Sequence, residues 1–474
     1  MRRSCVSAPW LLAVVALTWM TVPMAAAQTC LCGSAGDEFV AAGAGLVREW
    51  VVQIPFDSAG WRLGHVVVGD DLIVAQSGDG GVHVVQASEP IAGGAFSARP
   101  GCVLWSERVG KPGGPMQQAG IGSAVVTVAR DLDVYGFDAA TGRQLWQRPS
   151  GHAASAAAVP VGKWAFVPLQ GDGMLKMPAD PQSLAAAMLL ADGPEGRRRL
   201  GGNAAAERKV LAALEPLSLQ PGGDVSLPPQ RFGGIPRLVT DAVLWLTTRG
   251  KLVVLSDAPK GWERYEREIG GAPSGAPIVR GLSVFVASED NAVMRLDLVR
   301  KAGITRIQDA WVTNLDDQPE AGPLLHRDTV VVSLGPAGIA AFSARTGANL
   351  WRSPTVGRLV AGVGERIWCH AETGRLEALD LASGGRRETL CIGCFTLPVV
   401  NTVTEKLLLA SPGGLLVSLA SGRAPAPAAE AVQPKAEAAG QEQPPAEEQP
   451  AANPFEQDDN AAENAAANDA ADGG

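Results

Sequence analysis

The chain has 474 residues, 46% of them hydrophobic and 19% charged, which is the composition of an ordinary globular protein with a real core. The formal net charge is −9, but residues 424–474 alone hold eleven acidic residues and one lysine. The rest of the chain is therefore nearly neutral. This balance argues against a nucleic-acid partner, which requires a basic surface.

The first 27 residues have the pattern of a signal peptide. Arg2 and Arg3 precede an apolar stretch at 10–22, and Ala25-Ala26-Ala27 supplies a cleavage site. The apolar stretch is too short for a spanning helix, so no transmembrane segment is expected after cleavage. Cys30 could instead carry a lipid anchor, although the residues before it fit that poorly. We expect a periplasmic or secreted protein that starts near Gln28, with a lead at 28–45.

A repeated hairpin pattern follows the lead. Residues 46–54 form one strand around Trp50, and then eight segments share the order strand, tight turn, strand: 72–85, 124–135, 164–177, 243–255, 283–296, 329–342, 366–379 and 406–419. Most are preceded by a short strand and followed by an outer strand. Starts spaced about forty residues apart, with four short strands per repeat, predict the blades of a propeller.

Several outer strands carry a tryptophan at a fixed distance from a turn. In residues 133–146, Asp138 and Thr141-Gly142 precede Trp146, and Thr346-Gly347 precedes Trp351 with the same spacing. The segment 378–388 repeats the turn, but Glu388 stands in place of the tryptophan. A large apolar ring beside a turn needs a partner sheet, so these residues are predicted to pack between blades. The candidate structural docking residues are Trp50, Trp105, Trp146, Trp262, Trp311, Trp351, Gly142 and Gly347.

This pattern resembles the tryptophan-docking motif of the pyrroloquinoline quinone (PQQ)-like propellers. The resemblance implies an all-β, eight-bladed β-propeller over residues 46–423. The eighth hairpin lacks an outer strand, and the strand around Trp50 lacks a blade. We therefore expect the N-terminal strand to close the last blade and to remove two free sheet edges.

The family has two functional branches. Its quinoprotein dehydrogenases bind PQQ and calcium, with an aspartate base and a disulfide between adjacent cysteines. This chain has no adjacent cysteines, and no residue can be assigned as calcium ligand or base. Apart from the lipidation signal, the sequence fits the other branch better, which is typified by the outer-membrane assembly scaffold BamB. This resemblance implies a monomeric ring that has no cofactor, binds a partner protein and is not an enzyme. A carbohydrate- or surface-binding propeller is a third possibility.

Two regions interrupt the repeat. An insertion at about 178–230 contains two helix-like alanine-rich stretches around the basic run Arg197-Arg198-Arg199, and it is either a solvated loop or a partner-docking surface. Residues 424–474 are rich in Ala, Pro, Glu, Gln and Asn and lack an apolar period. We expect this acidic tail to be disordered.

The cysteines favour structural disulfides. Cys5 leaves with the signal, and six cysteines remain in an exported chain. The pattern Cys391-Ile-Gly-Cys394 is found in redox sites, but here it lies between blades rather than at a helix start, where such thiols obtain a low pKa. Together with Cys30 and Cys32 it could also form a zinc site. We expect a staple from Cys30 or Cys32 to Cys391 or Cys394, with a local Cys391–Cys394 pair as the alternative. The five histidines show no metal-ligand spacing, so no catalytic, cofactor or metal residue is assigned.

Overall fold

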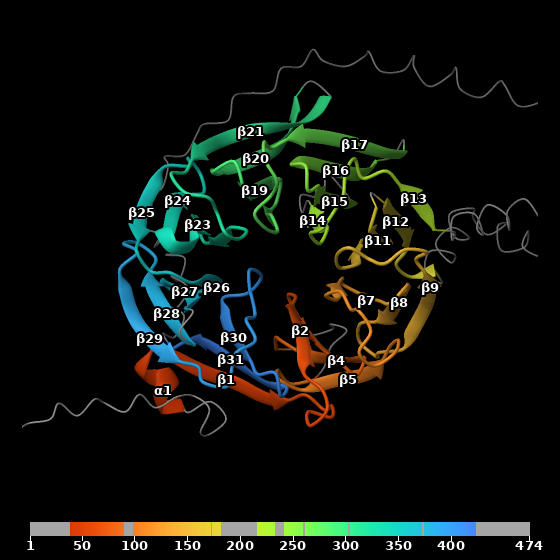
Figure 1. Ribbon diagram of the computed structural model, residues 1–474, viewed down its shortest axis with the longest axis horizontal. Helices are drawn as coiled ribbons and strands as arrows, with labels where there is room; N and C mark the ends of the chain where they lie inside the picture. The colour runs from red at the N-terminus through yellow and green to blue at the C-terminus, as the bar shows by residue number, and fades with distance from the viewer. Residues whose placement is uncertain are drawn as a thin grey trace, which may run out of the picture. The chain divides into compact units, whose positions relative to one another are not determined.

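The computed structural model describes residues 38–89, 98–171, 173–181, 216–232, 241–258, 261–301, 304–371 and 374–422. The expected signal peptide, the cysteines of the lead, most of the insertion and the acidic tail lie outside these residues. Within them the regular secondary structure is almost entirely β-strand, arranged as eight sheets around a ring (Figure 1). The predicted fold class, an all-β propeller of eight blades, is confirmed.

The first four blades follow one another along the chain, each with four antiparallel strands in sequence order. Their strands are β2 (Leu63–Val68), β3 (Leu72–Ser77), β4 (Gly81–Gln86) and β5 (Val103–Arg108); β6 (Gly120–Ile121), β7 (Val125–Arg130), β8 (Asp133–Asp138) and β9 (Gln144–Pro149); β10 (Val159–Val161), β11 (Trp164–Leu169), β12 (Gly173–Pro178) and β13 (Leu217–Leu219); and β14 (Gln230–Phe232), β15 (Asp241–Leu246), β16 (Lys251–Ala258) and β17 (Gly261–Glu268).

Blades 5 to 7 repeat the same order. They contain β18 (Ile278–Arg280), β19 (Ser283–Ser288), β20 (Ala292–Lys301) and β21 (Ile304–Asn314); β22 (Leu324–His326), β23 (Thr329–Ser333), β24 (Ile339–Ser343) and β25 (Asn349–Ser353), with the 3-10 helix η1 (Gly335–Ala337); and β26 (Arg358–Val363), β27 (Arg366–Ala371), β28 (Arg375–Asp380) and β29 (Arg386–Cys391). Blade 8 holds β30 (Lys406–Ala410) and β31 (Leu415–Ser421), and Leu397 pairs with Ala410 on its inner side.

The N-terminal strand completes blade 8, as predicted. Strand β1 (Leu46–Gln53) runs antiparallel to β31, with a register from Leu46 opposite Ser421 to Gln53 opposite Leu415. In Figure 1 this red strand lies on the outer side of the blue strands β30 and β31. The first and last parts of the ring are thus joined by a backbone hydrogen-bond ladder, and no sheet edge is left open between them.

The hydrophobic core lies between blades rather than inside each sheet. The described residues form eight buried clusters, and each cluster joins two neighbouring blades. The middle strands are buried along their whole length, as in β3, β4 and β7, because neighbouring blades cover both faces. The outer strand β1 alternates between buried and more exposed positions. This burial explains why the middle strands are rich in valine, leucine, isoleucine and alanine.

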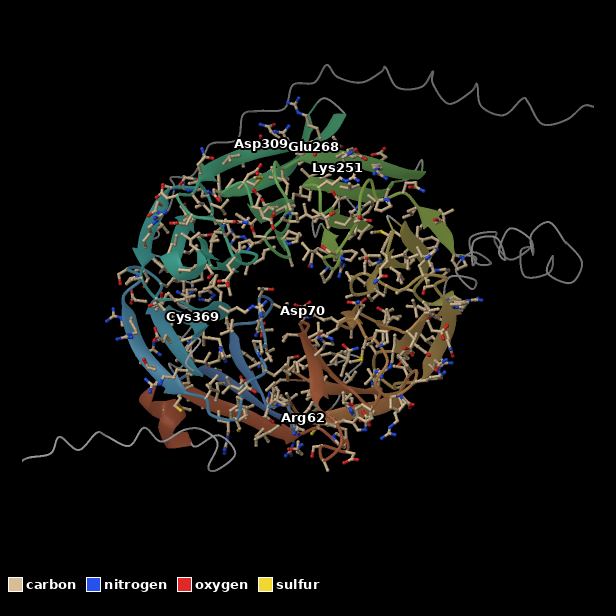
Figure 2. The ribbon with its side chains drawn as sticks, in the orientation of Figure 1. Arg62, Asp70, Lys251, Glu268, Asp309 and Cys369 are labelled. Carbon is tan, nitrogen blue, oxygen red and sulfur yellow. The ribbon has the colours of Figure 1, made fainter. Side chains whose placement is uncertain are left out.

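Blades 4 and 5 carry the longest hairpins of the described ring. Strands β20 and β21 pair over ten positions, and β16 and β17 over eight. Charged side chains cover their outer surface, including Lys251, Glu268 and Asp309 (Figure 2). Arg267 on β17 binds both carboxylate oxygens of Asp309 on β21, at 3.1 and 2.5 Å. A bidentate pair of this kind joins the two outer strands across the blade boundary.

Candidate functional site

Four of the predicted tryptophans bridge neighbouring blades in the same way. Each side chain is mostly or wholly buried, and its indole N–H donates to a backbone carbonyl just after the third strand of the next blade. The bonds run from Trp105 to Ala139 (2.9 Å), from Trp146 to Ala179 (2.8 Å), from Trp311 to Ala344 (3.0 Å) and from Trp351 to Leu381 (2.8 Å). A buried indole that finds a hydrogen-bond acceptor combines packing with a fixed orientation.

The turn glycines receive these rings. Gly142 and Gly347, both with φ +73°, would place an added Cβ only 2.6 Å from Trp105 and Trp311. Gly384 repeats the arrangement, with φ +70° and 2.3 Å to Trp351. Any other residue would meet both a left-handed backbone and a steric overlap. The sequence motif therefore pairs each turn glycine with the tryptophan of the preceding blade.

Three blades replace the docking tryptophan. In blade 2 the docking Trp146 lies opposite Gly136 of the third strand. At the matching position, blade 3 has Leu217 opposite Lys176. Blade 7 has Glu388 opposite Ala378. In blade 4 this position is taken by Tyr265, opposite Val254. Tyr265 packs against the buried cluster that blade 4 shares with blade 5. Trp262, which we expected at this position, pairs with Asp257 three residues away, and its side chain lies outside the described residues.

A polar bridge stands where blade 7 lacks its tryptophan. Arg366 pairs with Glu388 at 2.9 Å and donates to the carbonyl of Ala44 at 2.9 Å. The helix α1 (Glu38–Gly43) precedes this carbonyl, and Ala41 and Ala44 are buried in the cluster between blades 7 and 8. The residues just before β1 therefore fill the gap that a docking tryptophan fills elsewhere.

The boundary between blades 8 and 1 also departs from the pattern. Trp50 is buried over Gly101, where an added Cβ would lie 2.8 Å from the Trp50 side chain, but its indole N–H has no acceptor among the described residues. The carbonyl of Ala87 instead accepts from Lys406 at 3.3 Å. Lys406 also pairs with Glu49 of β1 at 2.9 Å. This ion pair joins β30 directly to the closing strand.

The structure separates the described cysteines into two kinds. Cys391, at the end of β29, is disulfide-bonded, and neither Cys394 nor the free thiols of Cys102 and Cys369 is its partner. Cys30 and Cys32 lie outside the described residues, so the staple to the N-terminal lead stays a prediction. Burial, followed by the charge of Glu377, raises the pKa of the Cys369 thiol to about 12. Cys369 is therefore a protonated core residue rather than a nucleophile.

A buried polar chain in blade 1 was not found from the sequence. The Ser77 hydroxyl donates to Asp79 at 2.5 Å and lies 3.3 Å from Nε2 of His83, whose Nδ1 contacts the Ser106 hydroxyl at 2.9 Å. Burial lowers the pKa of His83 to about 4, although the nearby Asp79 charge opposes this. In the sequence, only the turn Gly78-Asp79-Gly80 and the nearby His83 could have indicated this chain of side chains.

This chain of side chains is suited to holding strands together rather than to catalysis. Asp79 contacts Ser77 and not His83, which is unlike a Ser-His-Asp triad, where the carboxylate orients the histidine. Ser77, Asp79 and His83 are all buried, so a substrate has no access to the hydroxyl. The bonds link β3, the following turn, β4 and β5 within one blade.

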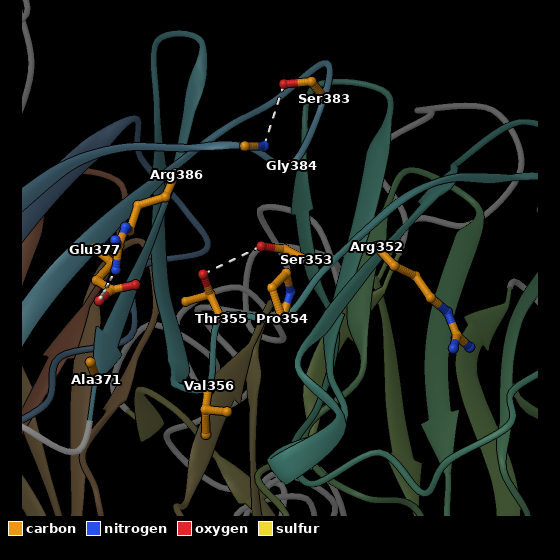
Figure 3. Close-up of a pocket in the computed structure, with 11 residues that line it drawn as sticks. Arg352, Ser353, Pro354, Thr355, Val356, Ala371, Glu377, Ser383, Gly384 and Arg386 are labelled. Atoms are coloured by element: carbon orange, nitrogen blue, oxygen red, sulfur yellow. Dashed lines mark hydrogen bonds and ion pairs between the residues drawn. The ribbon is translucent and has the colours of Figure 1, made fainter.

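An open groove lies between blades 6 and 7 (Figure 3). Its cavity volume is about 660 Å³. One side is formed by the end of β25 and the following residues, where the hydroxyls of Ser353 and Thr355 lie 3.3 Å apart. The other side carries Arg386 of β29 and Glu377 of β28, 3.4 Å apart. The groove is thus lined by hydroxyl groups, a cation and an anion.

The described part of the chain contains no group of three or more His, Cys, Asp or Glu side chains placed to hold a metal ion. No helix in these residues is long and apolar enough to cross a membrane.

Comparison with known proteins points to one family. Residues 300–388 match the family model described as outer membrane protein assembly factor BamB. BamB from Moraxella catarrhalis aligns with a TM-score of 0.56 at 14% identity, covering 79% of this chain and 97% of that one. Sqt1 from Saccharomyces cerevisiae gives 0.51 at 10% identity, with 77% and 97% covered, and the computationally designed protein Ika8 gives 0.50 at 11%, with 77% and 98% covered.

No curated protein sequence matches the chain significantly. The likenesses in structure show a shared fold, while the family match falls on blades 5 to 7, where two docking tryptophans and two turn glycines lie. The resemblance inferred from the docking motif is therefore confirmed by the family match over residues 300–388, and the ring is similar in fold to BamB.

Proposed function

We propose that the protein is an exported, non-enzymatic scaffold that binds a partner protein through the surface of its ring. The observation that supports this proposal is that the aromatic and polar residues described above hold the ring together, while a groove remains open. The docking tryptophans and the Ser77–His83 chain are buried and contact other parts of the ring. The groove between blades 6 and 7, in contrast, is open to solvent. The match to a family described as an outer membrane protein assembly factor supports a role in assembly.

The insertion is a second candidate for the partner surface, but it covers fewer residues than the range 178–230 expected from the sequence. Strand β13 lies inside the range 178–230 and forms the outer strand of blade 3. Pro221 accepts from the indole of Trp245 at 3.0 Å, and Val225 is buried in the cluster between blades 3 and 4. Residues 216–230 thus belong to the ring. Residues 182–215, which include Arg197-Arg198-Arg199, lie outside the described residues, and we propose them as the docking part of the insertion.

A two-variant capture experiment tests the proposal. The tagged full-length protein is exported, crosslinked in the periplasm and purified, and its partners are compared with those of a variant in which a Gly-Ser bridge replaces residues 182–215. The melting temperature should barely change, because shortening a surface segment has a small entropic effect. A stoichiometric partner that the variant loses places docking on this segment. A native protein that yields no reproducible stoichiometric partner contradicts the scaffold proposal.

A titration separates the scaffold from the dehydrogenase branch of the family. We expect the purified protein to give no absorbance shift with PQQ and calcium, and no dye reduction with alcohols or sugars. The reason is the lack of assignable calcium ligands, base and adjacent cysteines in the sequence. Stoichiometric PQQ binding with dye reduction would replace the scaffold proposal with an enzymatic one.

A further inference from the structure

We propose that the groove between blades 6 and 7 binds an extended acidic segment of a partner protein. This inference rests on the proposed function and names the chemistry of the partner. The groove volume of about 660 Å³ lies within the range of pockets that enclose specific ligands. Its lining combines apolar surface, hydroxyl groups and guanidinium groups, which together suit a peptide with alternating apolar and acidic side chains.

The cationic part of the groove has unused hydrogen-bonding capacity. The Arg386 side chain is 64% exposed and makes a single contact, from one guanidinium nitrogen to Glu377 at 3.4 Å. A guanidinium has five N–H donors, so most of those on Arg386 have no protein acceptor within the described residues. A carboxylate from a partner can therefore bind the free edge of Arg386 in the bidentate geometry that arginine favours.

A second arginine lies at the border of the groove. Arg352 also borders the groove, and its side chain extends away from the hydroxyl pair in Figure 3. It pairs at 3.0 Å with Asp316, a residue whose side chain is 84% exposed. An ion pair this exposed contributes little stability, so Arg352 can exchange Asp316 for a partner carboxylate at low cost. Among the residues that border the cavity, Arg352 and Arg386 are cationic and Glu377 is the one acidic residue.

The rest of the lining suits a backbone and small apolar side chains. Val356 is 39% exposed, a large hydrophobic side chain in solvent, and Pro354 and Ala371 border the same cavity. Ser353 and Thr355, whose hydroxyls form a pair, border the same cavity (Figure 3). An extended peptide could place one side chain against Val356 and the next acidic one on Arg386. Neighbouring side chains of an extended chain point to opposite sides, so such a peptide would straddle the hydroxyl pair.

Paired peptides and paired variants test the inference. Fluorescence anisotropy is measured with a labelled peptide of alternating valine and glutamate residues and with its glutamine counterpart. The proteins are wild type, Arg386→Gln and Arg148→Gln, the last an exposed arginine on the outer strand of blade 2. We expect Arg386→Gln to weaken binding of the acidic peptide about tenfold, as loss of a charge-assisted hydrogen bond does. Arg148→Gln should leave its binding unchanged.

The remaining outcomes separate this inference from the proposed function. Equal binding of the glutamine peptide, or no binding of the acidic one at about 1 mM, contradicts the inference. Inorganic phosphate and an unlabelled acidic peptide are also compared as competitors of the labelled peptide. If phosphate displaces the labelled peptide at the same concentration as the unlabelled peptide does, the groove is a general anion site and the inference is contradicted. If wild type and Arg386→Gln capture the same crosslinked partner equally, the groove is excluded while the scaffold proposal stands. If the native protein captures no partner, the scaffold proposal itself is contradicted.

Discussion

Replacing Trp351 with alanine is expected to lower the free energy of unfolding by about 3–5 kcal/mol, the usual effect of truncating a buried tryptophan. The side chain is 7% exposed and belongs to the buried cluster between blades 6 and 7. Its indole donates to Leu381 at 2.8 Å and its ring covers Gly384. The truncation therefore removes apolar contact, one hydrogen bond and the cover of a turn.

Two matched variants divide this effect into parts. Leu350 is the preceding residue on β25 and is 49% exposed, so Leu350→Ala should change stability by less than about 0.5 kcal/mol. Trp351→Phe keeps much of the apolar contact but loses the bond to Leu381, which should cost about 1 kcal/mol plus the lost area. Equilibrium urea unfolding followed by far-ultraviolet circular dichroism gives all three values. If Trp351→Ala is no less stable than Leu350→Ala, the docking residues do not hold the blades together.

Two further predictions concern His83 and Cys391. Burial lowers the pKa of His83 to about 4 from an ordinary 6.5, so the unfolded chain takes up the proton first, and stability should fall as the pH drops from 6.5 to 4, by on the order of 3 kcal/mol. Urea unfolding of His83→Gln should lack this part of the pH dependence, whereas the exposed His152→Gln should retain it. For Cys391, non-reducing tryptic mapping should recover peptide 28–48 joined to peptide 388–406. Recovery of peptide 388–406 alone, with Cys391 and Cys394 paired inside it, would contradict the staple.

The fold could be predicted because repetition amplifies a weak local signal. One hairpin with a turn glycine and a tryptophan says little, but the pattern of Gly142 and Trp146 recurs at Gly347 and Trp351. The unpaired strand around Trp50 and the incomplete eighth blade together predicted the closure. The replacement of tryptophan by Glu388 was also visible. Its compensation by Arg366 and Ala44 was not, because those residues lie more than 300 positions apart in sequence.

Where strand lengths or loops vary, spacing alone is misleading. The hairpin of β16 and β17 is longer than most of its counterparts, and the first aromatic residue of the outer strand, Trp262, is not the one in docking register. Strand β13 has only three residues and follows a long break in the repeat, so it was absorbed into the predicted insertion. The groove between blades 6 and 7 has no sequence motif. It depends on how the turn of one blade sits beside the outer strand of another, which only the assembled ring determines.

Ring closure by β1 is the central claim, and a circular permutant tests it directly. Deleting residues 28–56 removes β1 and should abolish cooperative thermal unfolding, because blade 8 loses its outer strand and Trp50 leaves the core beside blade 1. Moving the same residues to follow residue 422 through a short Gly-Ser linker returns β1 to β31 as a hairpin. The account predicts that this permutant melts cooperatively near the temperature of the parent. A deletion variant that melts like the parent, or a permutant that unfolds like the deletion, would contradict it.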